Sequence, residues 1–439
     1  MGKFVEFLDK HLSEPMGKLA AQRHLRAIRD GVASAIPFII VGSFFLILAA
    51  PPLPDGNALR DWMLQHSLVI GLPFRVTMFV MSLYVAFGIG YNLAKSYKID
   101  PLTGGQLALA ALLMTNFPTT IVDNPGWWMP LGNFGGAGLF VTMIVSIFAV
   151  EIFRLCVKYN ITIKMPEQVP DAISRSFAAI FPAAIVIILI GIVTLPNPIG
   201  FGIDLHDLMI QLVSPLVIAG DSLPGVLVLV FLITFFWSFG IHGVSVVGSV
   251  ARPFWLVYAE ANAAAIDAGY VGSALPHIAP ETFYQWFIWI GGSGATLGLL
   301  IACFIVARSK YLKTMSKAAF LPGLFNINEP VIFGMPIVLN PILMIPFMIA
   351  PLVMAIIAWF ATSIGLVNPT YAIAPWTLPA PIGAFIATGG DWMGVVLGLV
   401  NIAIATVIYI PFIKVYDASL VKQETEVDQT SEMDAVLAQ

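Results

Sequence analysis

The chain has 439 residues, of which 59% are hydrophobic and only 10% are charged, and its formal net charge is −4. Soluble domains carry about 25% charged residues, so the composition excludes a soluble protein and indicates a polytopic membrane protein. With about 20 apolar residues needed for each span, there is room for roughly ten spans. The 37 glycines and 31 prolines indicate interrupted helices, which are typical of transporters. We expect a lipid bilayer around the chain and no nucleic-acid partner.

The first residues predict a helix that lies in the membrane surface, because Phe4, Phe7, Leu8 and Leu12 share one helical face. The positive-inside rule places the N-terminus in the cytoplasm. Six basic residues before the first span carry that assignment: Lys3, Lys10, Lys18, Arg23, Arg26 and Arg29.

In the first half the sequence predicts uninterrupted membrane spans. The loops that join them alternate between loops that contain Lys or Arg and loops that do not. Five spans are expected, at residues 31–50, 68–94, 103–122, 134–157 and 177–195. We assign residues 1–200 to a scaffold domain that holds the dimer contact. An amphipathic linker is expected at 201–222.

The second half, residues 223–416, is predicted to be the substrate-binding transport domain. An inward span is expected at 223–250, followed by a broken helix or hairpin at 253–280 and an apolar run at 286–307. No Lys or Arg occurs between 318 and 413, so that stretch must hold a re-entrant hairpin and about three passes. Lys414 and Lys422 bring the C-terminus to the cytoplasm, and an acidic tail, 417–439, follows, with 423–439 expected to be disordered.

One carboxylate stands out in this apolar half. Glu329 is one of two charged residues between 318 and 413, and it lies in the run Asn326-Ile327-Asn328-Glu329-Pro330-Val331-Ile332-Phe333-Gly334-Met335-Pro336. Pro330 is expected to bias Glu329 away from helical geometry. Broken backbone at membrane depth survives only inside protein or beside a watery cavity, and an ionisable residue there is a functional hypothesis. The alternative is a helix-end glutamate at the interface.

His242 is the predicted partner of Glu329, because it is equally isolated in Trp237-Ser238-Phe239-Gly240-Ile241-His242-Gly243. A glutamate and a histidine suit proton handling at a substrate hydroxyl, and they would equally suit a proton relay. Taken alone, His242 could instead be a core histidine bonded to a helix carbonyl.

Aromatic and amide side chains nearby suit a sugar. Trp376 lies on a proline-broken segment, where its indole could stack on a sugar ring, and Trp237 could do the same. Either tryptophan could instead belong to an interfacial belt. Gln285 and Asn326 are amides in apolar surroundings that could bind hydroxyls.

Other patterns predict no chemistry. The glycine run 291–295 lacks the Gly-Lys-Ser/Thr ending of a phosphate loop and suits close helix packing. His206 and Asp207 have no third ligand at metal spacing. Cys156 and Cys303 are expected to be small core residues. We expect neither a metal nor a cofactor.

The Glu329 run together with Gly240-Ile241-His242-Gly243 resembles the membrane component, enzyme IIC, of the bacterial phosphoenolpyruvate-dependent sugar phosphotransferase system. The resemblance is to its lactose, cellobiose and diacetylchitobiose branch, and Trp376-Thr377-Leu378-Pro379 agrees with it.

This resemblance implies a homodimer of about ten spans and two re-entrant hairpins per protomer, in the bacterial plasma membrane with both termini cytoplasmic. It implies a β-linked disaccharide that is carried inward and phosphorylated at its 6-hydroxyl by a separate phospho-IIB protein, with IIA upstream. The chain would therefore be the permease part of a sugar phosphotransferase. Glu329 and His242 would meet the reacting hydroxyl. The implied sugar contacts also include Trp237, Gly240, Gln285, Asn326, Asn328 and Trp376.

Two other functions stay open from the residues alone. A proton-coupled sugar symporter could use Glu329 and His242 as its relay, and a channel-like facilitator would need no chemistry. In the permease model the second half, about residues 220–416, is expected to move against the first, with a hinge at 196–200 and in the segment that follows through Leu223.

Overall fold

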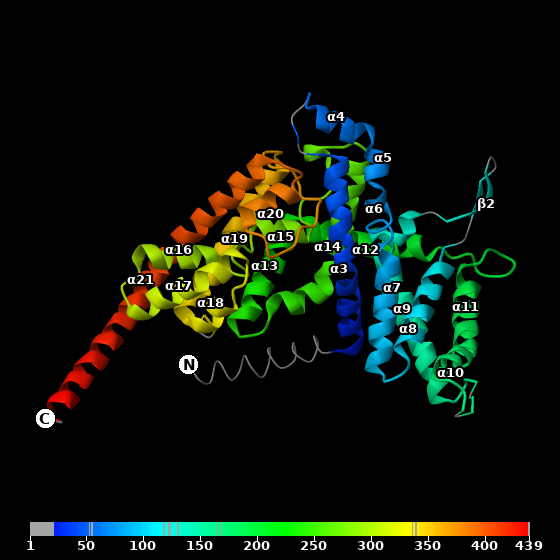
Figure 1. Cartoon of the computed structure of the whole chain (residues 1–439), viewed down its shortest axis with the longest axis horizontal. Coiled ribbons are helices and arrows are strands. Elements are labelled where there is room, and N and C mark those ends of the chain that lie inside the picture. The colour runs from blue at the N-terminus through cyan, green and yellow to red at the C-terminus, as the bar shows by residue number, and fades with distance from the viewer. Residues whose placement is uncertain are drawn as a thin grey trace.

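The computed structural model describes residues 22–437 except 52, 54, 55, 117, 118, 122, 123, 130, 164, 167, 336 and 339. Apart from one short β-hairpin, every regular element in these residues is helical (Figure 1). The predicted surface helix at Phe4–Leu12 lies outside the described residues.

The first half contains one long helix, a set of shorter ones and the hairpin. Its elements are α3 (Arg23–Ala49), α4 (Ala58–Gln65), α5 (Ser67–Ile70), α6 (Leu72–Arg75), α7 (Met81–Ser96), α8 (Pro101–Met114), β1 (Thr119–Ile121), β2 (Asn124–Trp128), η2 (Leu131–Phe134), η3 (Gly136–Gly138), α9 (Leu139–Lys158), α10 (Asp171–Ala178) and α11 (Ile180–Thr194).

The second half alternates long helices with short broken ones. Its elements are α12 (Leu205–Asp221), α13 (Leu223–Ser238), α14 (Gly243–Asp267), η4 (Gly272–Ala274), α15 (Glu281–Phe287), α16 (Thr296–Val306), α17 (Lys310–Leu324), α18 (Glu329–Gly334), α19 (Pro341–Ser363), α20 (Ala380–Ala387) and α21 (Trp392–Leu437).

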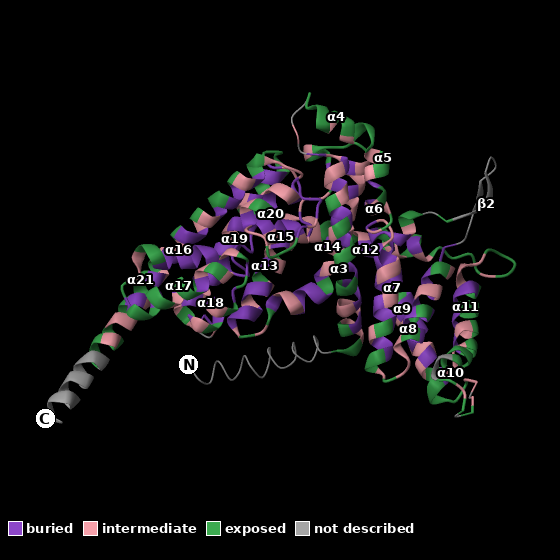
Figure 2. Cartoon of the chain, viewed as in Figure 1, coloured by how far each residue is buried: buried purple, intermediate pink, exposed green. Residues whose placement is uncertain are grey.

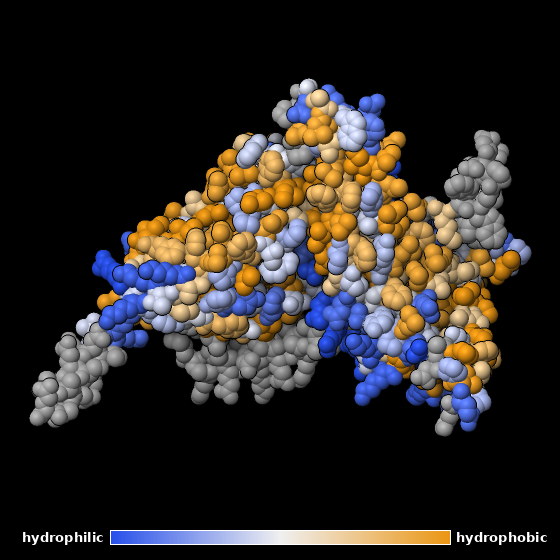
Figure 3. Space-filling view, viewed as in Figure 1, coloured by the Kyte–Doolittle hydropathy of each residue, from blue (hydrophilic) through white to orange (hydrophobic). Residues whose placement is uncertain are grey.

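The chain is an all-helical membrane protein with several apolar spans. Within the described residues, five helices are long and apolar enough to cross a membrane, and a sixth span would result if α12 and α13, bent by 77°, count as one. The five are Arg23–Ala49, Gly136–Lys158, Ile173–Thr194, Pro341–Ser363 and Trp392–Glu426. Figure 3 shows broad apolar surfaces over the helices of the first half and of the second half. Hydrophilic side chains gather along the lower edge and near α4.

Two predicted continuous spans are wrong because the backbone breaks within them, and the apolar run 286–307 breaks in the same way. Residues 68–94 divide into α5, α6 and α7, and 286–307 divide into the end of α15, a loop and α16. The run 223–250 ends its first helix at Ser238 and starts its second at Gly243. Gly240, with φ of +77°, makes that turn, in a region that favours glycine. Hydropathy did not reveal these breaks, because the residues on both sides of each are apolar.

Two further expectations are corrected. Of the broken helix or hairpin expected at 253–280, the hairpin is wrong: α14 continues through Pro253 to Asp267, and irregular chain with the short η4 follows as far as α15. The tail from 423, expected to be disordered, continues helix α21 as far as Leu437. Cys156 and Cys303 are buried and unpaired, as expected.

The long helices α3 and α14 separate the two groups of helices. In Figure 1, α7–α11 lie on one side of α3, whereas α13 and α15–α21 lie on the other. The largest buried apolar cluster contains residues of the second half only, from Val226 to Ile413. A second cluster joins α3 and α7 to α14 through Leu256, Ala259 and Ala263. Figure 2 shows that these buried residues fill the interior of each group.

Helix α21 supplies polar side chains to backbone groups that the broken segments leave free. Asn401 Nδ2 donates to the oxygen of Phe287 (2.7 Å), and the Tyr409 hydroxyl donates to that of Gly294 (2.6 Å). Further along, the Asp417 carboxylate accepts from two backbone N–H groups before α17, those of Arg308 and Ser309. Buried polar backbone needs such partners, so α21 holds the loops beside it in place.

Candidate functional site

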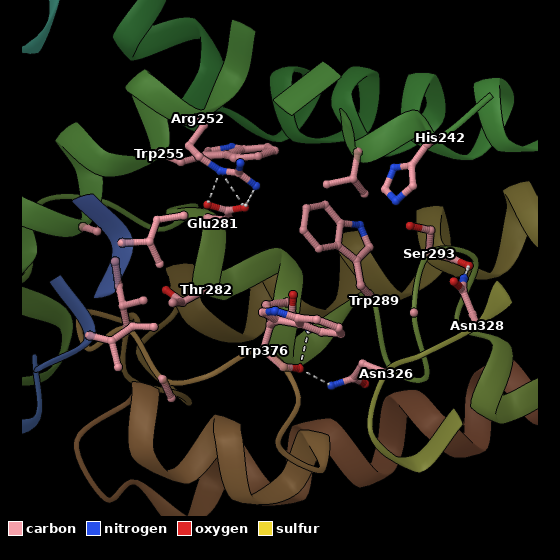
Figure 4. Close-up of a pocket in the computed structure, with 18 of the residues that line it drawn as sticks. His242, Arg252, Trp255, Glu281, Thr282, Trp289, Ser293, Asn326, Asn328 and Trp376 are labelled. Carbon is pink, nitrogen blue, oxygen red and sulfur yellow. Dashed lines mark hydrogen bonds and ion pairs between the residues drawn. The ribbon is translucent and has the colours of Figure 1, made fainter. Parts of the chain in front are cut away.

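A cavity of about 300 Å³ lies where the broken segments of the second half meet (Figure 4). Its walls come from α14, α15 and the irregular segments around residues 242, 289–293, 326–329 and 373–376. Helix α3 of the first half adds Ile36 and Ile40. Seven of the eight predicted site residues line this cavity: Trp237, His242, Gln285, Asn326, Asn328, Glu329 and Trp376.

His242 is held with one ring nitrogen facing its own helix. It is the N-cap of α14, and its Nδ1 accepts the backbone N–H of Ser245 (3.1 Å). A neutral imidazole that accepts at Nδ1 carries its proton at Nε2, so His242 is a hydrogen-bond donor on its other edge. The ring of Trp237 packs against it, with 4.4 Å between the ring centroids. His242 is exposed at the cavity, which differs from a core histidine bonded to a helix carbonyl.

Glu329 is an exposed carboxylate at the cavity wall. Within the described part of the chain it has no hydrogen bond and no ion pair. The expectation that Pro330 keeps it out of a helix is wrong. Glu329 is the first residue of the short helix α18, and Pro330 stands in the first turn, where a missing N–H costs nothing. The Glu329 oxygens are therefore available to a bound solute.

The side-chain amides of the two asparagines near Glu329 form hydrogen bonds with backbone groups. Asn326 Oδ1 accepts from the N–H of Gly291 (2.9 Å), and its Nδ2 donates to the oxygens of Trp376 (2.8 Å) and Leu378 (2.9 Å). Asn328 Nδ2 donates to the oxygen of Ser293 (2.9 Å). These amides join three irregular segments around the cavity, so much of their role is to position the wall.

Four tryptophans line the cavity, and they differ in exposure. Trp376 is 55% exposed, whereas Trp237, Trp255 and Trp289 are almost fully buried. The indole N–H groups of Trp237 and Trp289 have no acceptor among the described residues, whereas that of Trp255 is paired with the Tyr284 hydroxyl. A sugar can use such a site twice, by stacking its apolar face on a ring and by accepting an N–H bond at a hydroxyl.

Gly240 does not line the cavity. Gly240 affects the cavity indirectly. Its left-handed backbone conformation turns the chain between Trp237 and His242, which both line the cavity. Gln285 does line the cavity, and its Nε2 makes a 3.5 Å contact with the oxygen of Trp376.

Several lining residues were missed by sequence reasoning. Arg252 and Glu281 form a bidentate ion pair at the cavity, with Arg252 Nη2 2.6 Å from Glu281 Oε1. They flank the run 253–280, which was expected to form a broken helix or hairpin. Trp289 and Ser293 lie in a run that hydropathy could not distinguish from a plain span. Arg252 is the only Asp, Glu, Lys or Arg between Asp221 and Glu260, so isolation in apolar sequence, the signal that found Glu329, could have found it too.

The glycine run is a set of sharp turns. Gly291, Gly292 and Gly294 all have φ between +82° and +100°. A Cβ on Gly294 would lie 2.1 Å from the ring of Phe347. The run is not itself helical, but Gly294 does allow the expected close packing, against Phe347 of α19, and the glycines allow the loop before α16 to bend tightly beside the cavity.

No group of three or more His, Cys, Asp or Glu among the described residues could hold a metal ion. His206 instead lies within 3.0 Å of the Thr115 hydroxyl, next to the end of α8. The cavity is lined by hydroxyl, amide, indole, imidazole, guanidinium and carboxylate groups.

A tryptophan-lined polar cavity among broken helices is typical of membrane proteins that transport small polar solutes. The fold and the site together define such a transport protein.

Known proteins identify its family. Residues 29–351 match the family model described as Phosphotransferase system, EIIC. The chain is 40% identical to the lichenan permease IIC component of Bacillus subtilis (strain 168), over 98% of this chain and 97% of that one. It is 38% identical to the cellobiose-specific EIIC component of Geobacillus stearothermophilus, over 97% and 96%.

A lactose-specific EIICB component of Lacticaseibacillus casei is 33% identical, over 96% of this chain and 73% of that one. A crystal structure of the IIC component from the N,N'-diacetylchitobiose-specific phosphotransferase system matches with a TM-score of 0.86 and 38% identity, covering 95% of this chain and 99% of that one. The chain belongs to the EIIC family of the phosphotransferase system. It is a multi-pass sugar permease component of the bacterial cytoplasmic membrane, which works with a IIB protein.

Proposed function

We propose that this chain binds a β-linked disaccharide of the cellobiose, lactose or diacetylchitobiose type, carries it inward, and presents its 6-hydroxyl for phosphorylation. The observation that carries the proposal is the unpartnered Glu329 carboxylate, which lines one cavity together with His242 and four tryptophans. Relatives named for lichenan, cellobiose and lactose support the sugar class.

The chemistry follows from what each group can do. A primary alcohol is a weak nucleophile, and a carboxylate such as Glu329 can accept its proton as the oxygen attacks phosphorus. The His242 Nε2–H can donate to the same hydroxyl oxygen and orient it. Phosphoryl transfer depends mainly on positioning and electrostatics, so the membrane site supplies the acceptor and a docked phospho-IIB protein supplies the donor.

The same proposal includes the arrangement in the membrane. We infer about ten passes with two re-entrant hairpins, both termini in the cytoplasm, and a homodimer formed through the first half. Residues of about 220–416 would move as one body and carry the sugar across. The breaks around residues 239–242 and 288–295, and the turn before α18, support this arrangement, because interrupted helices are common where transporters bind solute.

Uptake of labelled disaccharide into vesicles tests the function against its main alternative. Vesicles carrying the chain, with IIA, IIB and the general phosphotransferase proteins inside, should accumulate sugar phosphate only when phosphoenolpyruvate is present. An uncoupler should have no effect. Accumulation of unmodified sugar that collapses with an uncoupler would instead establish a proton-coupled symporter, with Glu329 and His242 as its relay. Equilibration without accumulation or phosphorylation would indicate a facilitator.

A further inference from the structure

The cavity has two chemically different ends. In Figure 4, His242, Ser293 and Asn328 lie at one end, whereas Arg252 and Glu281 lie at the other. The rings of Trp289 and Trp376 lie between them. The proposed reacting hydroxyl occupies only the first end, so a solute with two rings extends toward the second.

The charged end is built to bind polar groups. The Arg252 guanidinium uses Nε and Nη2 on the Glu281 carboxylate, at 2.6–3.2 Å. Its third nitrogen, Nη1, has no acceptor in the described part of the chain. Each Glu281 oxygen keeps acceptor capacity beyond these bonds. The pair thus offers N–H donors and carboxylate acceptors side by side, which matches neighbouring hydroxyls on one sugar ring.

The position of this ion pair distinguishes it from a purely structural one. The side chains of Arg252 and Glu281 are 20% and 27% exposed, and both line the cavity. Arg75 and Asp267 form a pair of similar exposure, 29% and 20%, but neither lines the cavity. Charges inside a membrane protein typically face a cavity and mark a solute path.

Resting on the proposed function, we propose that the Arg252–Glu281 pair is the subsite for the second sugar ring and makes the protein select a disaccharide over a monosaccharide. Glu281 holds the guanidinium plane, and Arg252 Nη1 and the Glu281 oxygens bind hydroxyls of the ring that is not phosphorylated.

Binding to the purified full chain tests this. The probes are cellobiose, lactose and diacetylchitobiose, each with the methyl β-glycoside of its single ring. The disaccharide that wild type binds most tightly is then measured with the double variant Arg252→Gln/Glu281→Gln, which keeps side-chain length and removes both charges. Its Kd should rise about 10- to 100-fold, as expected for lost hydrogen bonds to charged groups. The Kd for the methyl glycoside should change by less than about 2-fold.

A matched control is the bidentate pair of Arg75 and Asp267, with a 3.0 Å contact and 29% and 20% side-chain exposure, which does not line the cavity. The variant Arg75→Gln/Asp267→Asn should leave both Kd values unchanged. An equal loss for both sugars in the Arg252/Glu281 variant, or no loss for the disaccharide, would overturn the subsite. Wild type that binds no member of the panel would reject the proposed function itself.

Two measurements keep the test independent of folding. Arg252→Lys keeps the charge but removes the planar fork, so it should lose disaccharide affinity selectively. In wild type, removing hydroxyls of the second ring in deoxy-disaccharides should lower affinity, whereas the Arg252→Lys variant should be less sensitive to the same removal. Equal sensitivity in both proteins would show that the pair does not contact that ring.

Discussion

The side-chain nitrogen of Asn326 lies 2.8 Å from the backbone oxygen of Trp376, fifty positions further along the chain. The same amide bonds Leu378 and Gly291, so one side chain fixes three irregular segments at the sugar cavity. Asn326 is therefore a positioning residue for the Trp376 ring as well as part of the wall.

Asn326→Asp should lower both sugar affinity and thermal stability, because a carboxylate has no N–H for the two carbonyls. The stability loss should be about 1–3 kcal/mol, the cost of leaving buried acceptors unpaired. Thermal unfolding in detergent and sugar titration measure the two effects. Asn340→Asp is the matched control, since the Asn340 side-chain oxygen accepts from the Ile342 and Leu343 N–H groups and Asp caps a helix equally well. Unaltered affinity in Asn326→Asp would show that the link does not shape the site.

Glu329→Gln should abolish sugar phosphorylation and leave sugar binding measurable, because the amide keeps the shape and loses the basicity. Phosphate transfer from phospho-IIB in vesicles and equilibrium sugar binding separate these effects. Asp391→Asn, at the other charge of the 318–413 run, is the control. That carboxylate accepts backbone bonds from Asn368 and Met393, away from the cavity, and its loss should spare phosphorylation. Normal sugar-phosphate formation by Glu329→Gln would remove the carboxylate from the mechanism.

Trp376→Ala should cost about 1–3 kcal/mol of sugar affinity, the usual effect of truncating an aromatic anchor. The ring is 55% exposed at the cavity, so its face is open for stacking. Trp376→Phe should retain part of that affinity. Trp392→Ala, at a 71% exposed ring outside the cavity, should change nothing in the same titration. A Kd for Trp376→Ala equal to that of wild type would return this ring to the membrane interface.

Trp289→Phe should weaken sugar binding by several-fold, because it removes a buried N–H that has no acceptor among the described residues. Trp286→Phe is a close control. Its indole N–H is also buried and without an acceptor in the described chain, but Trp286 does not line the cavity. Both variants should lose some stability from the smaller ring, and only Trp289→Phe should raise the sugar Kd. Equal Kd values in the two variants would mean that the Trp289 N–H does not bind sugar.

Cross-linking across the Arg75–Asp267 contact should stop transport if the second half moves against the first. Arg75 lies in α6 and Asp267 ends α14, so the pair joins the two halves. Cysteines at both positions, joined by a short thiol reagent after replacement of Cys156 and Cys303, should block uptake but not binding. A pair inside the second half, Lys310→Cys/Glu424→Cys, should leave uptake intact, since the Glu424 carboxylate accepts from the Lys310 backbone N–H and α17 and α21 would move together. Full uptake by the completely cross-linked Arg75/Asp267 protein would contradict the movement.

Sequence analysis found the central residues of the site because they are isolated polar side chains in apolar segments. Glu329 and His242 are isolated in apolar runs, and the structure places both at one cavity. The helix breaks at Gly240 and before α16 were invisible to hydropathy, because apolar residues lie on both sides of each. Arg252 is likewise isolated in apolar sequence, but 29 positions separate it from Glu281, and only the fold brings the two together at the cavity.

The polar contacts of α21 also depend on the direction in which each side chain points around the helix axis. Asn401, Tyr409 and Asp417 bond backbone near Phe287, Gly294 and Ser309, and all three stand on one helix at spacings of eight residues. Eight residues turn an α-helix through about 800°, so each of these side chains is offset by about 80° from the one before it, and the contacts wind around α21. Inserting one residue between Asn401 and Tyr409 would rotate everything beyond it by about 100° and turn the later contacts away from their partners. The spacing within this last helix thus determines where its polar side chains meet the broken segments beside it. In α21 a change of length therefore does more harm than most changes of residue type.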